Sequence, residues 1–223
     1  LRESLAQSVN TYYFDLAYRM GPDRLEAYMR RLGFGAPTGI DLLGEAQGIV
    51  PGNAYARGRF QRDLYPGENV ISGIGQGFWV VTPLQLAQAT AALATGVRHA
   101  PHLLRATEAG FGSPRTPEPQ PPGEPVVSDP AHVAAVRDGL EAVMHGPTGT
   151  ARGSAGDAAY RMAGKTGTVQ RVSRQGDERL DPTRLPYHLR HQALFVGYAP
   201  VEAPEIAIAV VVVGAAAVTV VAV

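Results

Sequence analysis

The sequence predicts an α+β fold in which helices pack on an antiparallel sheet. Four helical patterns lie before residue 146, and three strand-like runs follow one another after it. Because these runs are consecutive, neighbouring strands are expected to pair antiparallel. The chain has 223 residues, of which 45% are hydrophobic, and this is enough for one large core or two small ones.

The first two helices are predicted between Asn10 and Gly33. From Asn10 onward apolar residues recur every three to four positions, and Gly21–Pro22 ends this pattern. Asp23 can cap a second helix, which ends before Gly33. The two helices are expected to form a hairpin.

The following segment is predicted to be mostly irregular. Residues 34–70 are rich in glycine and proline and have no sustained period, so at most one short strand is expected, near residues 39–43. The glycine run Gly73–Gly77 lacks the spacing of a dinucleotide-binding loop, and no strand precedes it. Close backbone packing is therefore the favoured interpretation, and a phosphate site is the alternative.

Two longer helices have clear start signals. Thr82–Gln85 is a capping box with proline at the first helical position, and it begins a helix of small residues that ends near Gly96 and is predicted to be buried. Asp129–Pro130 begins an amphipathic helix that ends at Gly146. Between them, residues 111–127 contain six prolines, which predicts an extended, unpaired surface loop.

The strand-like runs are Tyr160–Val172, Gln192–Tyr198 and Glu205–Val213. The polar connection of residues 173–191 is long for a hairpin but compatible with one. Ile206–Val223 carries no charge over eighteen residues, which is near the lower limit for crossing a bilayer. Its many β-branched valines favour a buried strand over a lipid-facing helix.

The composition excludes several classes of function. Twenty acidic residues balance twenty basic residues, so neither nucleic acid nor a charged membrane surface is indicated as a partner. The absence of cysteine excludes disulfides, thiolate metal sites and a cysteine nucleophile, but it does not identify the compartment. His188 and His191 could share a metal on a helix, but they lie in a polar loop without an obvious third ligand.

Lys165 is the first candidate for chemistry, because it is the only lysine among the twenty lysine and arginine residues. An ammonium can exchange a proton and its pKa changes with its surroundings, whereas a guanidinium stays charged. Lys165 lies in the predicted strand segment Ala163–Val169. The alternative interpretation is a solvated lysine retained by chance on a strand edge.

Ser8 and Asn10 are the candidate partners of Lys165. They stand two residues apart just before the first helix, and side chains at this spacing share a side in an extended segment or tight turn, although not on a helix. They could therefore line one wall of a cleft. The alternative is that one of them only caps the helix.

The ordered motifs resemble those of the penicillin-recognising serine acyltransferases, whose motif set is SxxK, SDN and KTG. The matching motifs here are Ser8-Val9-Asn10, the glycine run before Thr82–Gln85, and Lys165-Thr166-Gly167-Thr168. The resemblance is closest to the transpeptidase domain of class B penicillin-binding proteins, in particular the elongation-type penicillin-binding protein 2 group, and covers about residues 1–213. Supporting segments are residues 10–17, 32–35, 38–42, 65–68, 163–170 and 195–200.

The resemblance implies the β-lactamase-like fold of the penicillin-recognising serine transpeptidases and a D-alanyl-D-alanine transpeptidase that cross-links stem peptides in cell-wall synthesis. Ser8, Asn10 and Lys165 would be catalytic: Lys165 and Ser8 would return a proton to the leaving group, and Asn10 would hold the substrate amide. β-Lactams would acylate the enzyme. No cofactor and no metal ion are implied.

The same resemblance implies a substrate-binding role for Thr166, Gly167 and Thr168. The two hydroxyls would bind the substrate carboxylate, the backbone N–H of Thr168 would stabilise the oxyanion, and Gly167 would leave room for an extended peptide along the strand edge. Strict alternation along a strand places Lys165 opposite the two threonines, so a long lysine stem or a local twist is needed to bring all three into one cleft.

Because the only lysine is already assigned, the chain contains no SxxK motif. Residues 1–223 are therefore expected to be the C-terminal part of a transpeptidase domain that starts after the nucleophile motif, with the N-terminal part of the fold missing. The family usually ends in a C-terminal helix, but residues 215–223 are repetitive alanine and valine without a polar face.

The resemblance further implies a periplasmic protein anchored to the inner membrane through a segment absent from this chain. Its partners would be the peptidoglycan stem peptide, β-lactam antibiotics and a membrane glycosyltransferase, but not nucleic acid. Two other functions stay open: a catalytically inactive or penicillin-sensing scaffold of the same fold, and a related β-lactamase that hydrolyses its acyl-enzyme rapidly.

Overall fold

A computed structural model gives the arrangement of residues 1–156, 158–170, 185–186, 189–213 and 217–222. The helices are α1 (Arg2–Ala6), α2 (Asn10–Met20), α3 (Pro22–Arg31), α4 (Asn53–Phe60), α5 (Pro66–Ser72), α6 (Pro83–Thr95) and α7 (Pro130–His145). The strands are β1 (Val97–Arg98), β2 (Ala106–Glu108), β3 (Arg115–Pro117), β4 (Glu124–Pro125), β5 (Ala163–Val169), β6 (Gln192–Ala199), β7 (Ile206–Val213) and β8 (Ala217–Ala222).

The central element is an antiparallel sheet with the strand order β5-β6-β7-β8. The three predicted strand runs are β5, β6 and β7, so the predicted α+β layout with an antiparallel sheet is confirmed. The strand interpretation of the uncharged C-terminal segment is also confirmed, because β7 and β8 pair there. Among the described residues, no helix has the length and apolarity needed to cross a membrane.

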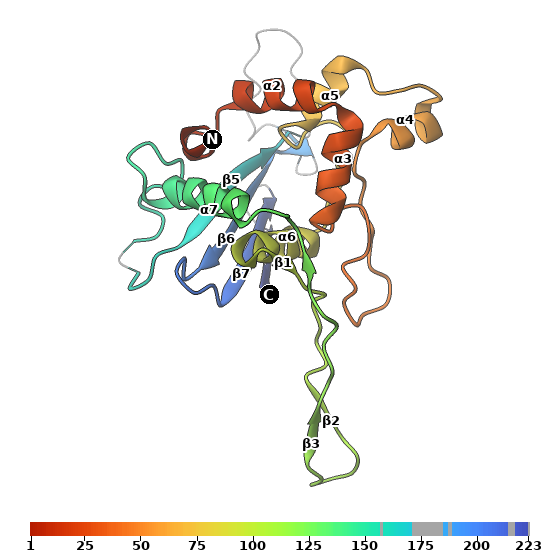
Figure 1. Cartoon of the computed structure of the whole chain (residues 1–223), viewed down its shortest axis with the longest axis vertical. Helices are drawn as coiled ribbons and strands as arrows, with labels where there is room; N and C mark the ends of the chain where they lie inside the picture. The colour runs from red at the N-terminus through yellow and green to blue at the C-terminus, as the bar shows by residue number, and fades with distance from the viewer. Residues whose placement is uncertain (157, 171–184, 187–188, 214–216, 223) are drawn as a thin grey trace.

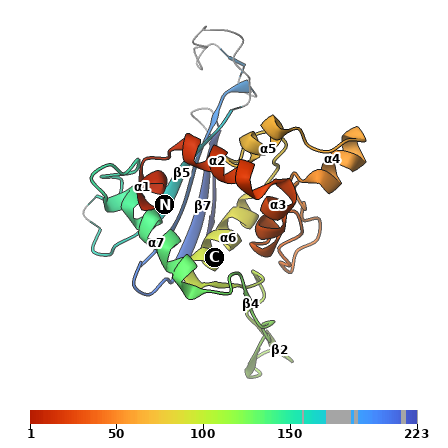
Figure 2. The same ribbon diagram turned by 45° about the horizontal axis from the view of Figure 1, so that its top comes forward.

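Helices α6 and α7 cover one face of this sheet (Figure 1, Figure 2). Ala163, Tyr198 and Ala207 are register partners across β5, β6 and β7, so their side chains share that face. Ala94 of α6 and Leu140 of α7 pack on them to form the central core. Small residues on α6 allow this close approach, as the sequence predicts for a buried helix.

The predicted start signals of α6 and α7 are confirmed. In α6 the backbone N–H of Gln85 donates to the Thr82 hydroxyl at 3.1 Å, and the Thr82 N–H donates to Gln85 Oε1 at 3.0 Å. Gly96 ends this helix in the left-handed conformation, with φ of 86°. In α7 the Asp129 carboxylate accepts a hydrogen bond from the Ala131 N–H at 2.9 Å.

Helix α3 does not fold back on α2 as a hairpin, but leaves it at a steep angle (Figure 1). Only Gly21 stands between the two helices, and its positive φ of 74° turns the chain sharply in one step. The prediction that Asp23 caps α3 is also wrong, because Gly21 occupies the N-cap position. Asp23 instead accepts hydrogen bonds from the backbone and side-chain nitrogens of Asn53.

The prediction of an irregular segment over residues 34–70 is wrong where the helices α4 and α5 lie. The segment contains the short helices α4 and α5, and residues 39–43 form no strand; the nearest β contact is the isolated bridge between Ile49 and Val80. Helix α4 buries only Ala56, so it has no apolar stripe that a periodicity search detects. Helix α5 begins at Pro66, where Glu68 accepts a hydrogen bond from the Tyr65 N–H at 2.8 Å.

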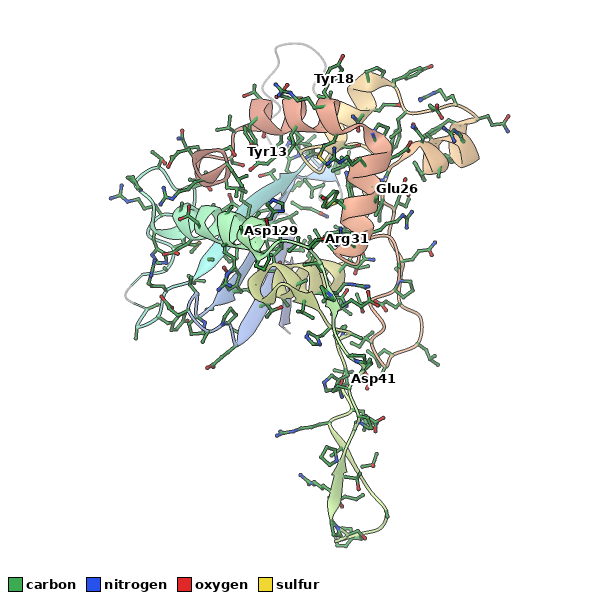
Figure 3. All side chains as sticks on the ribbon, in the orientation of Figure 1. Tyr13, Tyr18, Glu26, Arg31, Asp41 and Asp129 are labelled. Atoms are coloured by element: carbon green, nitrogen blue, oxygen red, sulfur yellow. The ribbon has the colours of Figure 1, made fainter. Side chains whose placement is uncertain are left out.

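The proline-rich region forms a thin projecting arm, defined here as residues 97–126 (Figure 1). Most of it is exposed as predicted, although Val126 at its end is buried. It is not unpaired, because β1 pairs with β4 and β2 pairs with β3. At the base of the arm, the Asp41 carboxylate accepts the backbone N–H groups of Leu103 and Leu104, both at 2.7 Å. Figure 3 places Asp41 at this junction.

Candidate active site

Ser8 lies in the bend between α1 and α2 and has a φ of 56°. This left-handed conformation is unfavourable for a residue with a side chain, and such residues concentrate at functional sites. Neither Ser8 nor Asn10 caps α2, because Val9 is the N-cap residue and makes no side-chain cap bond. The interpretation that Ser8 or Asn10 only caps the helix is therefore wrong, and both side chains are free of this structural role.

Contacts with α7 and the loop after it fix the position of this bend. A β-carbon added at Gly139 would lie 2.3 Å from Leu5 Cδ1, so the missing side chain lets α1 sit directly on α7. The backbone N–H of Thr150 donates to the Ala6 carbonyl at 3.0 Å. Two separate elements thus hold α1 in place and set where Ser8 points.

Lys165 meets Ser8 across the groove between this bend and β5. The Lys165 ammonium donates hydrogen bonds to Ser8 Oγ and to the backbone oxygen of Thr166, each at 2.9 Å. The expected contact between two residues 157 positions apart is thereby confirmed. Lys165 is partly buried, and this burial lowers the pKa of its ammonium. The alternative of a solvated lysine on an open edge does not describe this environment.

The hydrogen bonds of Lys165 explain how it shares a cleft with the two threonines. Its stem folds round the strand so that the ammonium reaches the backbone oxygen of the next residue. The Thr166 hydroxyl shares a hydrogen bond with the Thr150 hydroxyl at 3.0 Å, while Thr168 is exposed. The long side chain of Lys165 therefore brings its ammonium to the side of β5 on which the two threonines lie, although side chains alternate along the strand.

A cavity of about 580 Å³ brings together all six residues predicted for the site: Ser8, Asn10, Lys165, Thr166, Gly167 and Thr168. Tyr13 also lines it, from the side of α2 that faces β5, whereas Tyr18 points the opposite way (Figure 3). The remaining lining residues are Leu5, Gly73, Ile74, Gln76 and Gln170. A second cavity, of about 480 Å³, lies between α6 and the start of β7 and contains none of the predicted site residues.

The glycine run Gly73–Gly77 borders the cavity and has two structural roles. A β-carbon at Gly73 would lie 2.5 Å from the Ala17 β-carbon, so the predicted close packing is confirmed there. Gly75 and Gly77 have φ values of 74° and 83°, so they are needed for backbone conformation. Between them, Gln76 Nε2 donates to the Thr168 carbonyl at 2.9 Å.

Sequence reasoning missed Gln76 and Thr150 as site residues. Both contact the Lys-Thr-Gly-Thr segment from elements that are not part of the three-motif set. Gln76 lies in the glycine run that the resemblance includes, but nothing in the sequence marked its side chain as a contact of the strand. Thr150 lies in a loop rich in glycine and threonine, where no residue stood out.

The lowered pKa of Lys165 predicts a pH dependence of stability. Between the folded-state pKa and the ordinary value near 10.5, the unfolded chain binds more protons, so the free energy of unfolding rises with pH in that window. Below the folded-state pKa the lysine is protonated in both states, and burial of the charged ammonium lowers the free energy of unfolding by its full amount. Methionine has a similar length and no charge, so the melting temperature of Lys165→Met relative to that of wild type is expected to fall as the pH rises toward about 10.5. A constant difference in thermal unfolding of the full-length proteins would contradict this.

A lysine on an edge strand facing a Ser-x-Asn bend, within helices packed on an antiparallel sheet, defines the class of penicillin-recognising serine acyltransferases. Comparison with known proteins gives the same class. The chain belongs to the penicillin binding protein transpeptidase domain family, whose model matches residues 1–220. The predicted family and the penicillin-recognising fold are thereby confirmed.

Individual relatives agree with this family. The chain is 36% identical over 214 residues to the peptidoglycan D,D-transpeptidase MrdA of Haemophilus influenzae, covering 95% of this chain and 32% of that protein. Pseudomonas aeruginosa PBP2 in complex with WCK 5153 is 40% identical, with a TM-score of 0.79 and coverage of 96% of this chain and 44% of that one. PBP2 of Helicobacter pylori, in complex with MreC, is 29% identical with a TM-score of 0.79, covering 95% and 36%. The chain thus spans about a third of the length of the curated relatives it matches.

Proposed function

We propose that residues 1–223 are the C-terminal part of the transpeptidase domain of a peptidoglycan D,D-transpeptidase. The observation that carries this proposal is the 2.9 Å contact between the Lys165 ammonium and the Ser8 hydroxyl beside the edge strand β5. The nucleophilic serine and its lysine would come from residues outside this chain, because the chain contains no SxxK motif. The name of the Haemophilus influenzae relative supports the substrate class.

The first half of the reaction is acylation. The nucleophilic serine attacks the carbonyl of the penultimate D-alanine of a stem peptide, the peptide bond breaks, and the terminal D-alanine leaves as an amine. Lys165 and Ser8 together deliver a proton to that leaving nitrogen. Burial helps here, because a lowered pKa makes the Lys165 ammonium a better proton donor than an exposed lysine.

The residues around this pair would position the substrate. The Lys165 ammonium attracts the terminal carboxylate, and the hydroxyls of Thr166 and Thr168 bind it. Asn10 holds a substrate amide, and the backbone N–H of Thr168 donates to the oxyanion. Gly167 carries no side chain, which leaves the strand edge open to an extended peptide. In the second half of the reaction, an amine of a neighbouring stem attacks the ester and forms the cross-link.

The setting of the full-length protein follows from the same proposal. A cell-wall cross-linking enzyme acts in the periplasm, and a segment outside these residues would anchor it to the inner membrane. Its partners would be the stem peptide, β-lactams and a membrane glycosyltransferase. The Helicobacter pylori relative was solved in complex with MreC, and this supports a protein partner for the full-length protein.

The test is acylation of the full-length protein by a labelled penicillin, followed by release of D-alanine from a stem peptide. Stable labelling together with D-alanine release is the expected result. Labelling without D-alanine release would favour a penicillin-sensing scaffold. Rapid loss of the label with hydrolysis of the penicillin would favour a β-lactamase, and no labelling at all would overturn the proposal.

A further inference from the structure

The loop that carries Gln76 is shaped to bring one carboxamide onto the edge of β5. Gly75 has a φ of 74°, and no heavy atom lies within 4 Å of the place where its β-carbon would stand. Glycine at this position therefore serves the left-handed backbone and not close packing. Gly77, with a φ of 83°, makes the same kind of turn on the other side of Gln76. The result is the 2.9 Å hydrogen bond from Gln76 Nε2 to the Thr168 carbonyl.

This hydrogen bond lies on the free edge of the sheet. In the described part of the chain, β5 pairs only with β6, so its other edge faces the cavity. In an antiparallel sheet each residue directs its N–H and its C=O to the same side, and this side alternates along the strand. Thr166 and Thr168 are two residues apart, so both direct their backbone groups toward the cavity.

The two outward carbonyls that border the cavity, those of Thr166 and Thr168, are already bonded by side chains. The Lys165 ammonium donates to the Thr166 carbonyl and the Gln76 carboxamide donates to the Thr168 carbonyl, each at 2.9 Å. The N–H groups of the same residues remain directed at the cavity. Beside the cavity the edge thus offers donors to an incoming peptide, while the carbonyls of Thr166 and Thr168 are occupied by Lys165 and Gln76.

A peptide that adds to a sheet edge as a strand needs acceptors as well as donors, because its own N–H groups must be bonded. We propose that Gln76 is a placeholder for the substrate: its carboxamide occupies the Thr168 carbonyl until a peptide N–H of the substrate replaces it. This inference rests on the proposed function. Gln76 then competes with every ligand that brings an amide N–H to this carbonyl, and it does not compete with ligands that lack one.

The expected size of this competition follows from the net value of one hydrogen bond, which corresponds to about a two- to tenfold change in an equilibrium or rate constant. Removing the carboxamide is therefore expected to favour amide-bearing ligands by about that factor. Replacing a residue that only supports the fold would change the acylation rates of all ligands by the same factor. The ratio of the rates for two ligands, one with the amide N–H and one without it, therefore separates the two roles.

The experiment measures second-order acylation rates of the full-length protein with two β-lactams. One is a penicillin, whose ring carries an acylamino group with an N–H; the other is a carbapenem, whose ring carries a hydroxyethyl group instead. In Gln76→Ala, and equally in Gln76→Met, which keeps the side-chain length, the rate with the penicillin is expected to rise about two- to tenfold. The rate with the carbapenem is expected to stay within about twofold.

Four results would overturn the inference. A lower rate with the penicillin would make Gln76 a supporting contact for the substrate, and equal changes with both β-lactams would indicate a general structural effect. Unchanged rates with both would mean that the Thr168 carbonyl, which has two lone pairs, accepts both hydrogen bonds at once. A wild-type protein that neither β-lactam acylates would overturn the proposed function and this inference with it.

Discussion

Replacing Lys165 with methionine is expected to lower the rate at which labelled penicillin acylates the full-length protein by about 10²- to 10⁴-fold, the usual contribution of a positioned acid or base. The reason is the geometry of the ammonium, which lies 2.9 Å from Ser8 Oγ and beside the edge that binds the substrate. Methionine has a similar length but can neither transfer a proton nor attract a carboxylate. The measurement is the second-order acylation rate.

The variant Lys165→Arg separates the charge from the proton transfer. Arginine keeps the positive charge, but its guanidinium does not exchange a proton at working pH. We expect it to recover ligand binding more than acylation, so that the apparent dissociation constant improves over Lys165→Met while the acylation step stays slow. Recovery of the full acylation rate by arginine would show that charge alone is sufficient.

A double-variant cycle tests whether Lys165 and Ser8 act as a unit. Residues in one proton-transfer pair show strongly non-additive effects, because removal of either breaks the same step. The variant Ser8→Ala keeps a β-carbon at this left-handed position, so the backbone strain is unchanged and only the hydroxyl is removed. The double variant is expected to lose little more acylation than Lys165→Met alone. Multiplicative losses, or wild-type labelling of Lys165→Met, would contradict the proposed relay.

The elements that the sequence predicts well are those with local start and stop signals. The capping box of α6 joins Thr82 and Gln85, and Asp129 caps α7; both lie within a few residues of what they determine. The strands β5, β6 and β7 follow from their own composition. The meeting of Ser8 and Lys165, by contrast, came from the order of motifs in a family, because no local pattern brings together residues 157 positions apart.

The features that the sequence does not predict depend on contacts between distant parts of the chain or lack a periodic pattern. Helices α4 and α5 are short and bury little of their own surface, so periodicity does not mark them. Gln76 reaches Thr168 across 92 positions, and Thr150 reaches Thr166 from a loop without a pattern. Asp23 is a residue type that often caps a helix. Its carboxylate instead accepts hydrogen bonds from Asn53, because the turn at Gly21 places the two residues close together.

Replacing Gln85 with leucine is expected to lower the free energy of unfolding by about 3–5 kcal/mol, which is a large effect for one substitution. Gln85 is fully buried, and its Nε2 donates to the carbonyls of Ala36 and Gln47 at 2.7 and 2.9 Å. The carbonyls of Ala36 and Gln47 each lose this donor, at a cost of up to about 1–3 kcal/mol where water does not replace it. Leucine also removes the oxygen that accepts the Thr82 N–H. The measurement is the urea midpoint at constant m-value.

The control for this prediction is Thr82→Ala. It removes only the cap hydroxyl that accepts the Gln85 N–H, so a loss of about 0.5–2 kcal/mol is expected. The difference in free energy of unfolding between the two variants then measures how much the hydrogen bonds from the carboxamide to the carbonyls of Ala36 and Gln47, in the segment before α4, contribute to stability. If Gln85→Leu costs no more than Thr82→Ala, these carbonyls find water when the carboxamide is gone. That segment would then be held in place by its packing and not by this hydrogen-bonded side chain.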